Sequence, residues 1–115
     1  MATIKSYTDL DQSMVLADIL PLESVDTRYH IASHLHYTVE FGKASDKDIP
    51  CWSLAALLDV MPKGTDIIKE EADTENEKYM CTVGGIKDDI MSTFARTPVD
   101  ACVEMIVKLH KLKML

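Results

Sequence analysis

The chain has 115 residues, of which 47% are hydrophobic and 27% are charged, and its 19 acidic and 12 basic residues give a net charge of −7. This length excludes a separate catalytic domain beside a binding domain, so we expect a single α+β domain over residues 1–115. The acidic balance disfavours generic binding to nucleic acid or to anionic membrane surfaces.

The first part of the chain predicts a helix followed by extended structure. Thr8 is an N-cap candidate, and apolar residues then recur at helical spacing over 9–20 until Pro21 ends the run. From Thr27 to Phe41 aromatic and β-branched residues alternate with polar ones. This pattern predicts one strand or a hairpin that turns near Ser33 and His34, followed by a polar loop over 42–48.

A second helix is predicted from Pro50, at the first helical position, and it ends at Pro62 and Gly64. Apolar residues surround nearly its whole circumference, so we expect this helix to be covered on more than one side and to lie at the centre of the core. Its apolar window, 49–61, is too short to span a bilayer.

The third quarter of the chain predicts strands separated by an acidic loop. Residues 65–69 are a possible short strand, and the acidic run 70–77 is either a solvated loop or a face that docks a basic partner. Residues 78–83 alternate as a strand, and Gly84-Gly85 suits a two-residue hairpin turn. Segment 86–95 fits a strand or a helix, with the strand favoured.

The last helix has the clearest signals. Thr97, Pro98 and Asp100 provide an N-cap hydroxyl, a proline at the first helical position and a carboxylate three residues after the cap. The coarse order α, β, α, β, β, α predicts two or three helices packed on a small, largely antiparallel sheet, a helix–sheet–helix sandwich.

Two segments also carry a family resemblance: Pro50-Cys51-Trp52-Ser53-Leu54-Ala55-Ala56-Leu57-Leu58, and Thr97-Pro98-Val99-Asp100-Ala101-Cys102-Val103-Glu104-Met105-Ile106. The chain resembles small uncharacterised proteins of gut-bacterial phages, prophages and mobile elements, and more distantly the phage ABA sandwich domain. The resemblance covers about 8–20 and 49–115 and weakens over 28–48. It implies the sandwich fold and a phage or mobile-element origin, and it carries over no catalytic residue.

The cysteines and histidines are the main candidates for chemistry. Cys51, Cys81 and Cys102 form no C-x-x-C pair and predict reduced core residues of a cytoplasmic protein. The N-terminus is polar and acidic and lacks an apolar stretch of signal-peptide length. Cys51, after Pro50 at the expected helix N-terminus, is the cysteine best placed to be a nucleophile.

His30, His34 and His36 would face one side of a single uninterrupted strand and could bind a divalent metal together with Glu40, whereas a hairpin turn between them would destroy that geometry. Exposed histidines without a ligand are the more ordinary interpretation. Asp88 and Asp89 point to opposite faces of a strand and fit a solvated turn better than a metal site.

Trp52 is expected in the core with its N–H bonded rather than stacked on a ligand. Signatures of serine hydrolases, phosphate loops, dinucleotide folds, zinc proteases and EF-hands are absent from the sequence. We therefore predict no catalytic, cofactor-binding or metal-ligating residue and no enzyme activity.

Two functional hypotheses remain. The first is a non-catalytic protein-interaction module, an accessory protein of a phage or mobile element whose acidic residues 70–77 dock a partner. The alternative is a small-ligand binding protein for a nucleotide or metal, with Arg28 and Arg96 converging on a polyanion. Edge strands of a small sheet, together with Met114 and Leu115, make homo-oligomerisation plausible.

Overall fold

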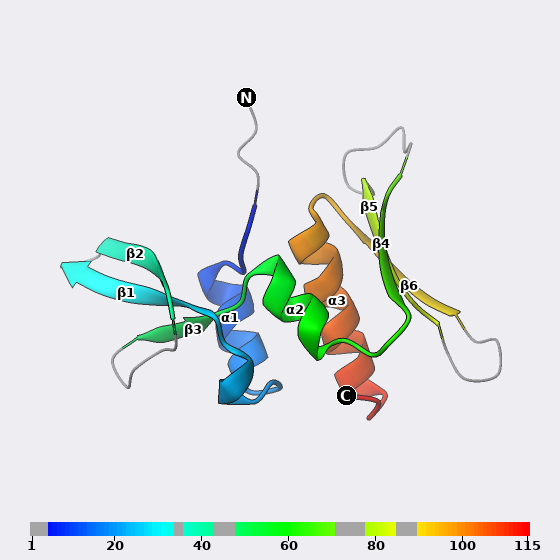
Figure 1. The fold of residues 1–115 in the computed structure, drawn as a ribbon, viewed down its shortest axis with the longest axis horizontal. Helices are drawn as coiled ribbons and strands as arrows, with labels where there is room; N and C mark the ends of the chain where they lie inside the picture. Colours follow the sequence, from blue (N-terminus) through cyan, green and yellow to red (C-terminus); the bar gives the residue numbers. More distant parts are fainter. Residues whose placement is uncertain (1–4, 34–35, 43–47, 71–77, 85–89) are drawn as a thin grey trace. The chain divides into compact units, whose positions relative to one another are not determined.

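Figure 1 shows a computed structural model of the protein, which describes residues 5–33, 36–42, 48–70, 78–84 and 90–115. The chain forms two units, an N-terminal unit over Ser6–Val60 and a C-terminal unit over Met61–Leu115 that also includes Lys5. Helices and antiparallel strands occur in both, which confirms the α+β class. The strands are divided between two three-stranded sheets, and the expectation of a single domain stays a prediction.

The N-terminal unit packs a short helix against a three-stranded sheet. Its elements are α1 (Leu10–Ala17), the 3₁₀ turn η1 (Leu22–Ser24), β1 (Thr27–Ser33), β2 (His36–Phe41), β3 (Ile49–Cys51) and α2 (Leu54–Val60). The sheet order is β2-β1-β3 with antiparallel pairing throughout, and α1 lies against β3. Of the two alternatives for 27–41, the hairpin is therefore confirmed.

Helix α1 begins one residue later than the sequence predicts. Asp9, not Thr8, is the N-cap, because the Asp9 carboxylate accepts the Gln12 N–H while the Gln12 side chain accepts the Asp9 N–H. This reciprocal pair satisfies two backbone donors at the helix start. Thr8 is fully buried and uses its hydroxyl on other partners, so the Thr8 prediction is wrong.

The second helix also begins later than expected. Pro50 and Cys51 belong to β3, where Pro50 pairs with Arg28. Ser53 caps α2 instead, since its hydroxyl accepts the N–H of Ala56 and its own N–H is held by Asp26. Of the α2 residues only Ala56 and Leu57 are buried, so the expectation of a helix covered on more than one side is wrong.

The interior of the N-terminal unit combines residues from both helices, from β1 and β3 and from connecting segments: Leu16, Leu20, Val25, Tyr29, Cys51, Trp52, Ala56 and Leu57 are buried. Trp52 Nε1 donates to Ser24 Oγ at 2.8 Å. This contact confirms the predicted core position of Trp52 with its indole N–H satisfied.

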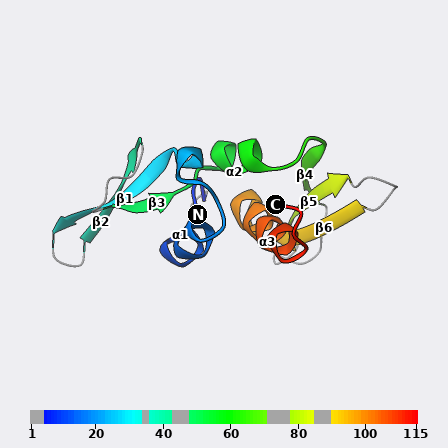
Figure 2. The same ribbon diagram turned by 90° about the horizontal axis from the view of Figure 1, so that it is seen from below.

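The C-terminal unit consists of β4 (Thr65–Lys69), β5 (Tyr79–Gly84), β6 (Ile90–Ala95) and α3 (Pro98–Lys111). The antiparallel sheet has the order β4-β5-β6, and α3 packs on β5 and β6 (Figure 2). The predicted strand in 86–95 is confirmed for its described part. Gly84 pairs with Ile90, so Gly84 belongs to the ladder rather than to the predicted turn, and Gly85 lies outside the described residues.

Helix α3 starts as its sequence predicts. Thr97 Oγ1 accepts the Asp100 N–H at 3.0 Å, and Pro98 occupies the first turn. The Asp100 carboxylate pairs with Lys5 Nζ at 2.6 Å. The apolar stripe of the helix is buried and consists of Val99, Ala101, Cys102, Val103, Met105, Ile106 and Leu109. Within the described part of the chain, no helix has the length and apolar character needed to cross a membrane.

Candidate functional site

A shallow hollow opens at the start of α1. Its volume is about 490 Å³, and Asp9, Leu10, Asp11 and Tyr29 line it. Both aspartates are exposed, while Tyr29 is largely buried and forms the floor. The hollow thus combines two carboxylates, an aliphatic side chain and an aromatic ring.

Tyr29 is also the middle ring of a cluster of three tyrosines. Its centroid lies 6.2 Å from that of Tyr7 and 6.5 Å from that of Tyr37, both in edge-to-face geometry. Tyr7 is 38% exposed and Tyr37 is 43% exposed. Aromatic side chains are therefore available at the surface beside the hollow as well as in its floor.

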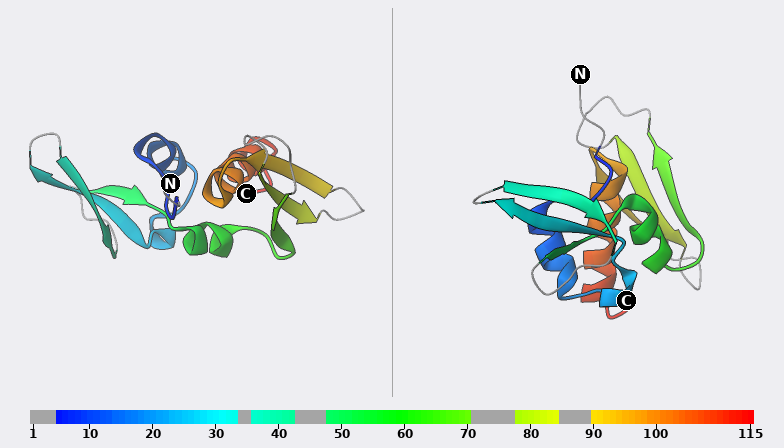
Figure 3. Two further views of the ribbon diagram at one scale, coloured as in Figure 1. Left: turned by 90° about the horizontal axis from the view of Figure 1, so that it is seen from above. Right: turned by 60° about the vertical axis from the view of Figure 1, so that its left-hand side comes forward.

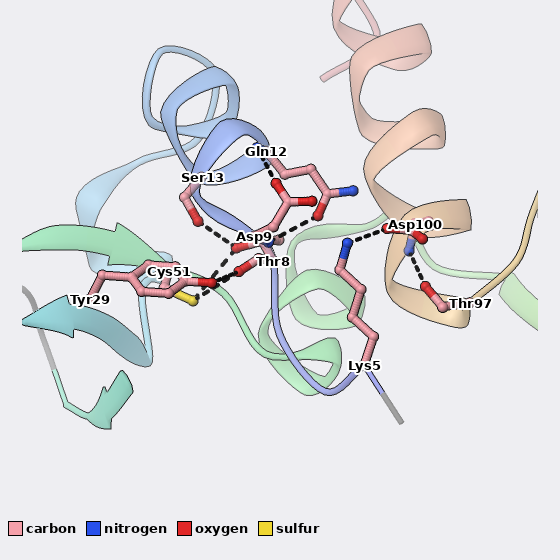
Figure 4. Close-up of polar contacts among 9 residues, drawn as sticks. All are labelled: Lys5, Thr8, Asp9, Gln12, Ser13, Tyr29, Cys51, Thr97 and Asp100. Carbon is pink, nitrogen blue, oxygen red and sulfur yellow. Dashed lines mark hydrogen bonds and ion pairs between the residues drawn. The ribbon is translucent and has the colours of Figure 1, made fainter. Parts of the chain in front are cut away.

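A buried hydrogen-bond network holds these groups in place (Figure 4). Thr8 is its hub: the Thr8 hydroxyl lies 2.7 Å from Ser13 Oγ and accepts the Trp52 N–H at 3.2 Å. The Thr8 N–H donates in turn to the Trp52 carbonyl at 2.9 Å. This network joins the residue before the α1 cap to the chain after β3 and to the first helical turn, so it fixes where the hollow's carboxylates lie.

The Tyr29 hydroxyl is part of the same network. It donates to the Thr8 carbonyl at 2.7 Å, and the Cys51 thiol donates to that carbonyl at 3.4 Å. Burial raises the pKa of Tyr29 above its ordinary value, and Cys51, Tyr7 and Asp9 add smaller effects in the same direction. The floor of the hollow therefore stays a neutral phenol, and the charge of the hollow comes from Asp9 and Asp11.

A second polar cluster lies on the face of the N-terminal sheet opposite Tyr29. It joins the β1–β2 hairpin, which Figure 3 shows, to the residue before β3. The Asp48 carboxylate, only 6% exposed, lies 2.9 Å from His30 Nδ1 and 3.5 Å from Arg28 Nε. Arg28 also contacts Glu40 at 3.3 Å and donates to the Phe41 carbonyl. A side chain at Gly42, where φ is +115°, would place its Cβ 2.7 Å from Arg28 Nη1, so a glycine suits this position.

The histidines do not lie on one uninterrupted strand, the arrangement on which a shared metal site would have depended. His30 is in β1 and His36 is in β2, with the hairpin between them, and His34 lies outside the described residues. The geometry that a shared metal site required is therefore lost. Among the residues that the structure describes, no group of three or more His, Cys, Asp or Glu side chains could hold a metal ion.

All three cysteines are free and fully buried. Cys51 lies in β3, so its expected place at an exposed helix N-terminus is wrong. Cys81 in β5 and Cys102 in α3 interact by a side-chain hydrogen bond, which lowers the pKa of Cys81 and, together with burial, raises the pKa of Cys102. The predicted core role of the cysteines is confirmed.

The remaining candidates have mixed outcomes. Arg28 contacts Asp48 and Glu40, and Arg96 is exposed. The two arginines belong to different units, so their convergence on a ligand stays a prediction. Of the acidic run only Glu70 is described, and Asp88 and Asp89 lie outside the described residues. Met114 and Leu115 are exposed.

Sequence reasoning missed the hollow itself. In the sequence, Asp9 and Asp11 are typical of residues at a helix start, and Tyr29 is one position of an alternating strand. A usable signal was present in Asp9 and Gln12, which have the spacing of a capping box and would have placed the cap correctly. Nothing in the local sequence showed that Tyr29 lies under the helix start.

Comparison with known proteins gives no relative: no protein-family model matches the chain, and no match is found among curated proteins or solved structures.

Proposed function

We propose that the chain is a non-catalytic protein-interaction module that binds a basic segment of a partner protein. The observation that supports this proposal is the hollow at the start of α1, where Asp9 and Asp11 stand beside Leu10 and Tyr29. The accessory role in a phage or mobile element, which the sequence resemblance implies, stays a prediction.

The chemistry of the hollow suits a lysine or arginine side chain. The aliphatic stem of such a residue covers apolar surface such as Leu10, while its charged head reaches a carboxylate. Tyrosine rings attract the same cations through their negative faces. The volume of about 490 Å³ accommodates a basic side chain with part of its backbone.

The charge of the whole chain favours the same class of partner. A net charge of −7 attracts a basic segment over several ångströms and raises its encounter rate. This general attraction does not by itself select a site. The aspartates of the hollow are distinguished from other exposed acids by their aromatic and aliphatic neighbours.

A peptide-binding experiment tests the proposal. The probe is a fluorescein-labelled peptide of alternating lysine and glycine, titrated by fluorescence anisotropy against the full chain. The variant Asp9→Asn/Asp11→Asn removes both carboxylates of the hollow, and asparagine retains the capping ability that Asp9 provides. The control Asp18→Asn/Glu23→Gln removes the same charge from exposed positions at and beyond the end of α1.

We expect the hollow variant to weaken binding about fivefold, since two exposed ion pairs contribute about 1 kcal/mol together. The control variant should change the affinity less than about twofold. Equal losses in the two variants would show that only the overall charge attracts the peptide. Failure of the unmodified chain to bind the basic peptide would also overturn the proposal.

A further inference from the structure

One edge strand of the C-terminal sheet differs from the other edge strands of the described structure. Strand β6 reads Ile90-Met91-Ser92-Thr93-Phe94-Ala95 and contains neither a charged residue nor a proline. In the sheet order β4-β5-β6 it pairs with β5 on one side, and no described strand pairs with its other side. An edge strand of this kind offers unpaired backbone groups to another chain.

The other edges carry features that discourage such pairing. The opposite edge of the same sheet, β4, contains Asp66 and Lys69. In the N-terminal sheet the edge strand β2 contains Glu40, and β3 has three residues that include Pro50. Charges, prolines and shortness protect edges in soluble proteins, so β6 lacks a protection that the others have.

The side chains of β6 suit pairing with a second copy. Ile90, Ser92 and Phe94 share the sheet face that is turned away from Cys81 and Val83, as their pairing with Gly84, Thr82 and Met80 shows. Ile90 is 70% exposed and Phe94 is 43% exposed. This face of the strand therefore presents an apolar residue on each side of a central serine.

We propose that β6 pairs antiparallel with β6 of a second copy of this chain, about a two-fold axis that passes between the two Ser92 residues. In this register Ile90 stands opposite Phe94 of the other copy, and the same contact occurs twice because the interface is isologous. Cross-strand pairs of an aromatic with a β-branched residue stabilise sheets. On the other face, Met91 stands opposite Thr93 of the second copy.

The charge and size of the contact indicate how stable this dimer is. Because β6 carries no charge, pairing it with itself opposes no like charges in the ladder, although each copy has a net charge of −7. Six residues give a contact about 20 Å long, which places the interface among small, transient ones. We expect a dissociation constant between about 10 μM and 1 mM.

Sedimentation velocity over a range of concentrations up to about 2 mM tests the dimer. Phe94→Lys places a charge in the proposed contact and should give a monomer throughout. Ile68→Lys is the matched control, because Ile68 is 44% exposed and lies in the same cross-strand row, Ile68–Met80–Phe94, but on the far edge. This control should dimerise like the unmodified chain, and thermal melts establish that both variants fold.

A crosslinking measurement covers the case in which a lysine variant fails to fold. In Ser92→Cys the two new thiols would lie about 5 Å apart, within reach of a short bis-maleimide, while the three native cysteines are buried. Thr82→Cys, one strand inward, would place its thiols about 14 Å apart and should not crosslink.

Dimerisation that Phe94→Lys abolishes and Ile68→Lys preserves supports the proposal, as does crosslinking restricted to Ser92→Cys. A chain that stays monomeric at every concentration overturns it. Loss of the dimer in both lysine variants, or equal crosslinking at Ser92 and Thr82, would indicate face-to-face packing and would also overturn it.

Discussion

Removal of the Tyr29 hydroxyl tests the network beneath the hollow. In Tyr29→Phe the ring and its edge-to-face contacts with Tyr7 and Tyr37 remain, whereas the hydrogen bond to the Thr8 carbonyl and the contact of the hydroxyl with the Cys51 thiol are lost. That carbonyl keeps the Cys51 thiol as a donor, so it is not left without a partner. The cost should therefore be that of one ordinary hydrogen bond, about 1 kcal/mol of unfolding free energy.

Urea denaturation followed by circular dichroism measures this change. A loss of about 1 kcal/mol lowers the urea midpoint by about 0.5 M for a protein of this size. Tyr37→Phe is the matched control, because Tyr37 is 43% exposed and its substitution should change the free energy by less than about 0.5 kcal/mol. Equal effects of the two substitutions, or no loss in Tyr29→Phe, would refute the argument that the network depends on this hydroxyl.

The same variant isolates a pH effect. Burial raises the pKa of Tyr29 above the ordinary value of 10.0, so above that pH the unfolded chain loses the proton while the folded chain keeps it. The folded state then binds more protons than the unfolded state, and stability falls as pH rises. The stability difference between the unmodified chain and Tyr29→Phe should be constant below about pH 9 and should shrink above pH 10.

Three further substitutions test other parts of the fold by thermal and urea denaturation. Ser24→Ala leaves the indole N–H of Trp52 without its acceptor, so it should lower the free energy of unfolding by about 1–2 kcal/mol and change the tryptophan emission. Unchanged emission and stability would contradict this contact. Thr97→Ala removes the N-cap of α3 and should cost about 1 kcal/mol, whereas Thr97→Ser should recover most of it. Burial, then the nearby Asp100, raises the pKa of Glu104, so its contribution is favourable at low pH and is lost as pH rises through the folded pKa. Glu104→Gln should therefore stabilise the chain at neutral pH and have no effect in acid, and destabilisation at neutral pH would contradict this sign.

The parts of the fold that the sequence predicts correctly rest on local signals. Thr97, Pro98 and Asp100 define a helix start within four residues, and the alternation in 78–83 is short-range. Segment 86–95 fits a strand or a helix locally, and the pairing of its described part with β5 decides for the strand. The identity of the buried residues of α3, which packs against its sheet, follows directly from the helical period of the sequence.

The errors arise where one residue type fits two local structures. Pro50 suits a first helical turn and also an edge strand, and its pairing with Arg28, 22 positions earlier in the chain, decided for the strand. Thr8 suits a cap, but its hydroxyl is used by Ser13 and Trp52, which left Asp9 to cap α1. The partner that places Pro50 in a strand is distant in sequence, so no local pattern contained it. The cap of α1, in contrast, was indicated locally by the spacing of Asp9 and Gln12.

The two proposed contacts should respond to salt in opposite directions. Peptide binding at Asp9 and Asp11 is an attraction between exposed opposite charges, and added salt screens it. Pairing of the uncharged β6 edges works against the mutual repulsion of two chains with a net charge of −7 each, so screening should strengthen it. Raising the salt concentration from about 20 mM to 500 mM should therefore weaken anisotropy binding and increase the dimer fraction in sedimentation. Weakening of both by salt would indicate that charged groups outside β6 hold the dimer together, which the structure of that edge does not support.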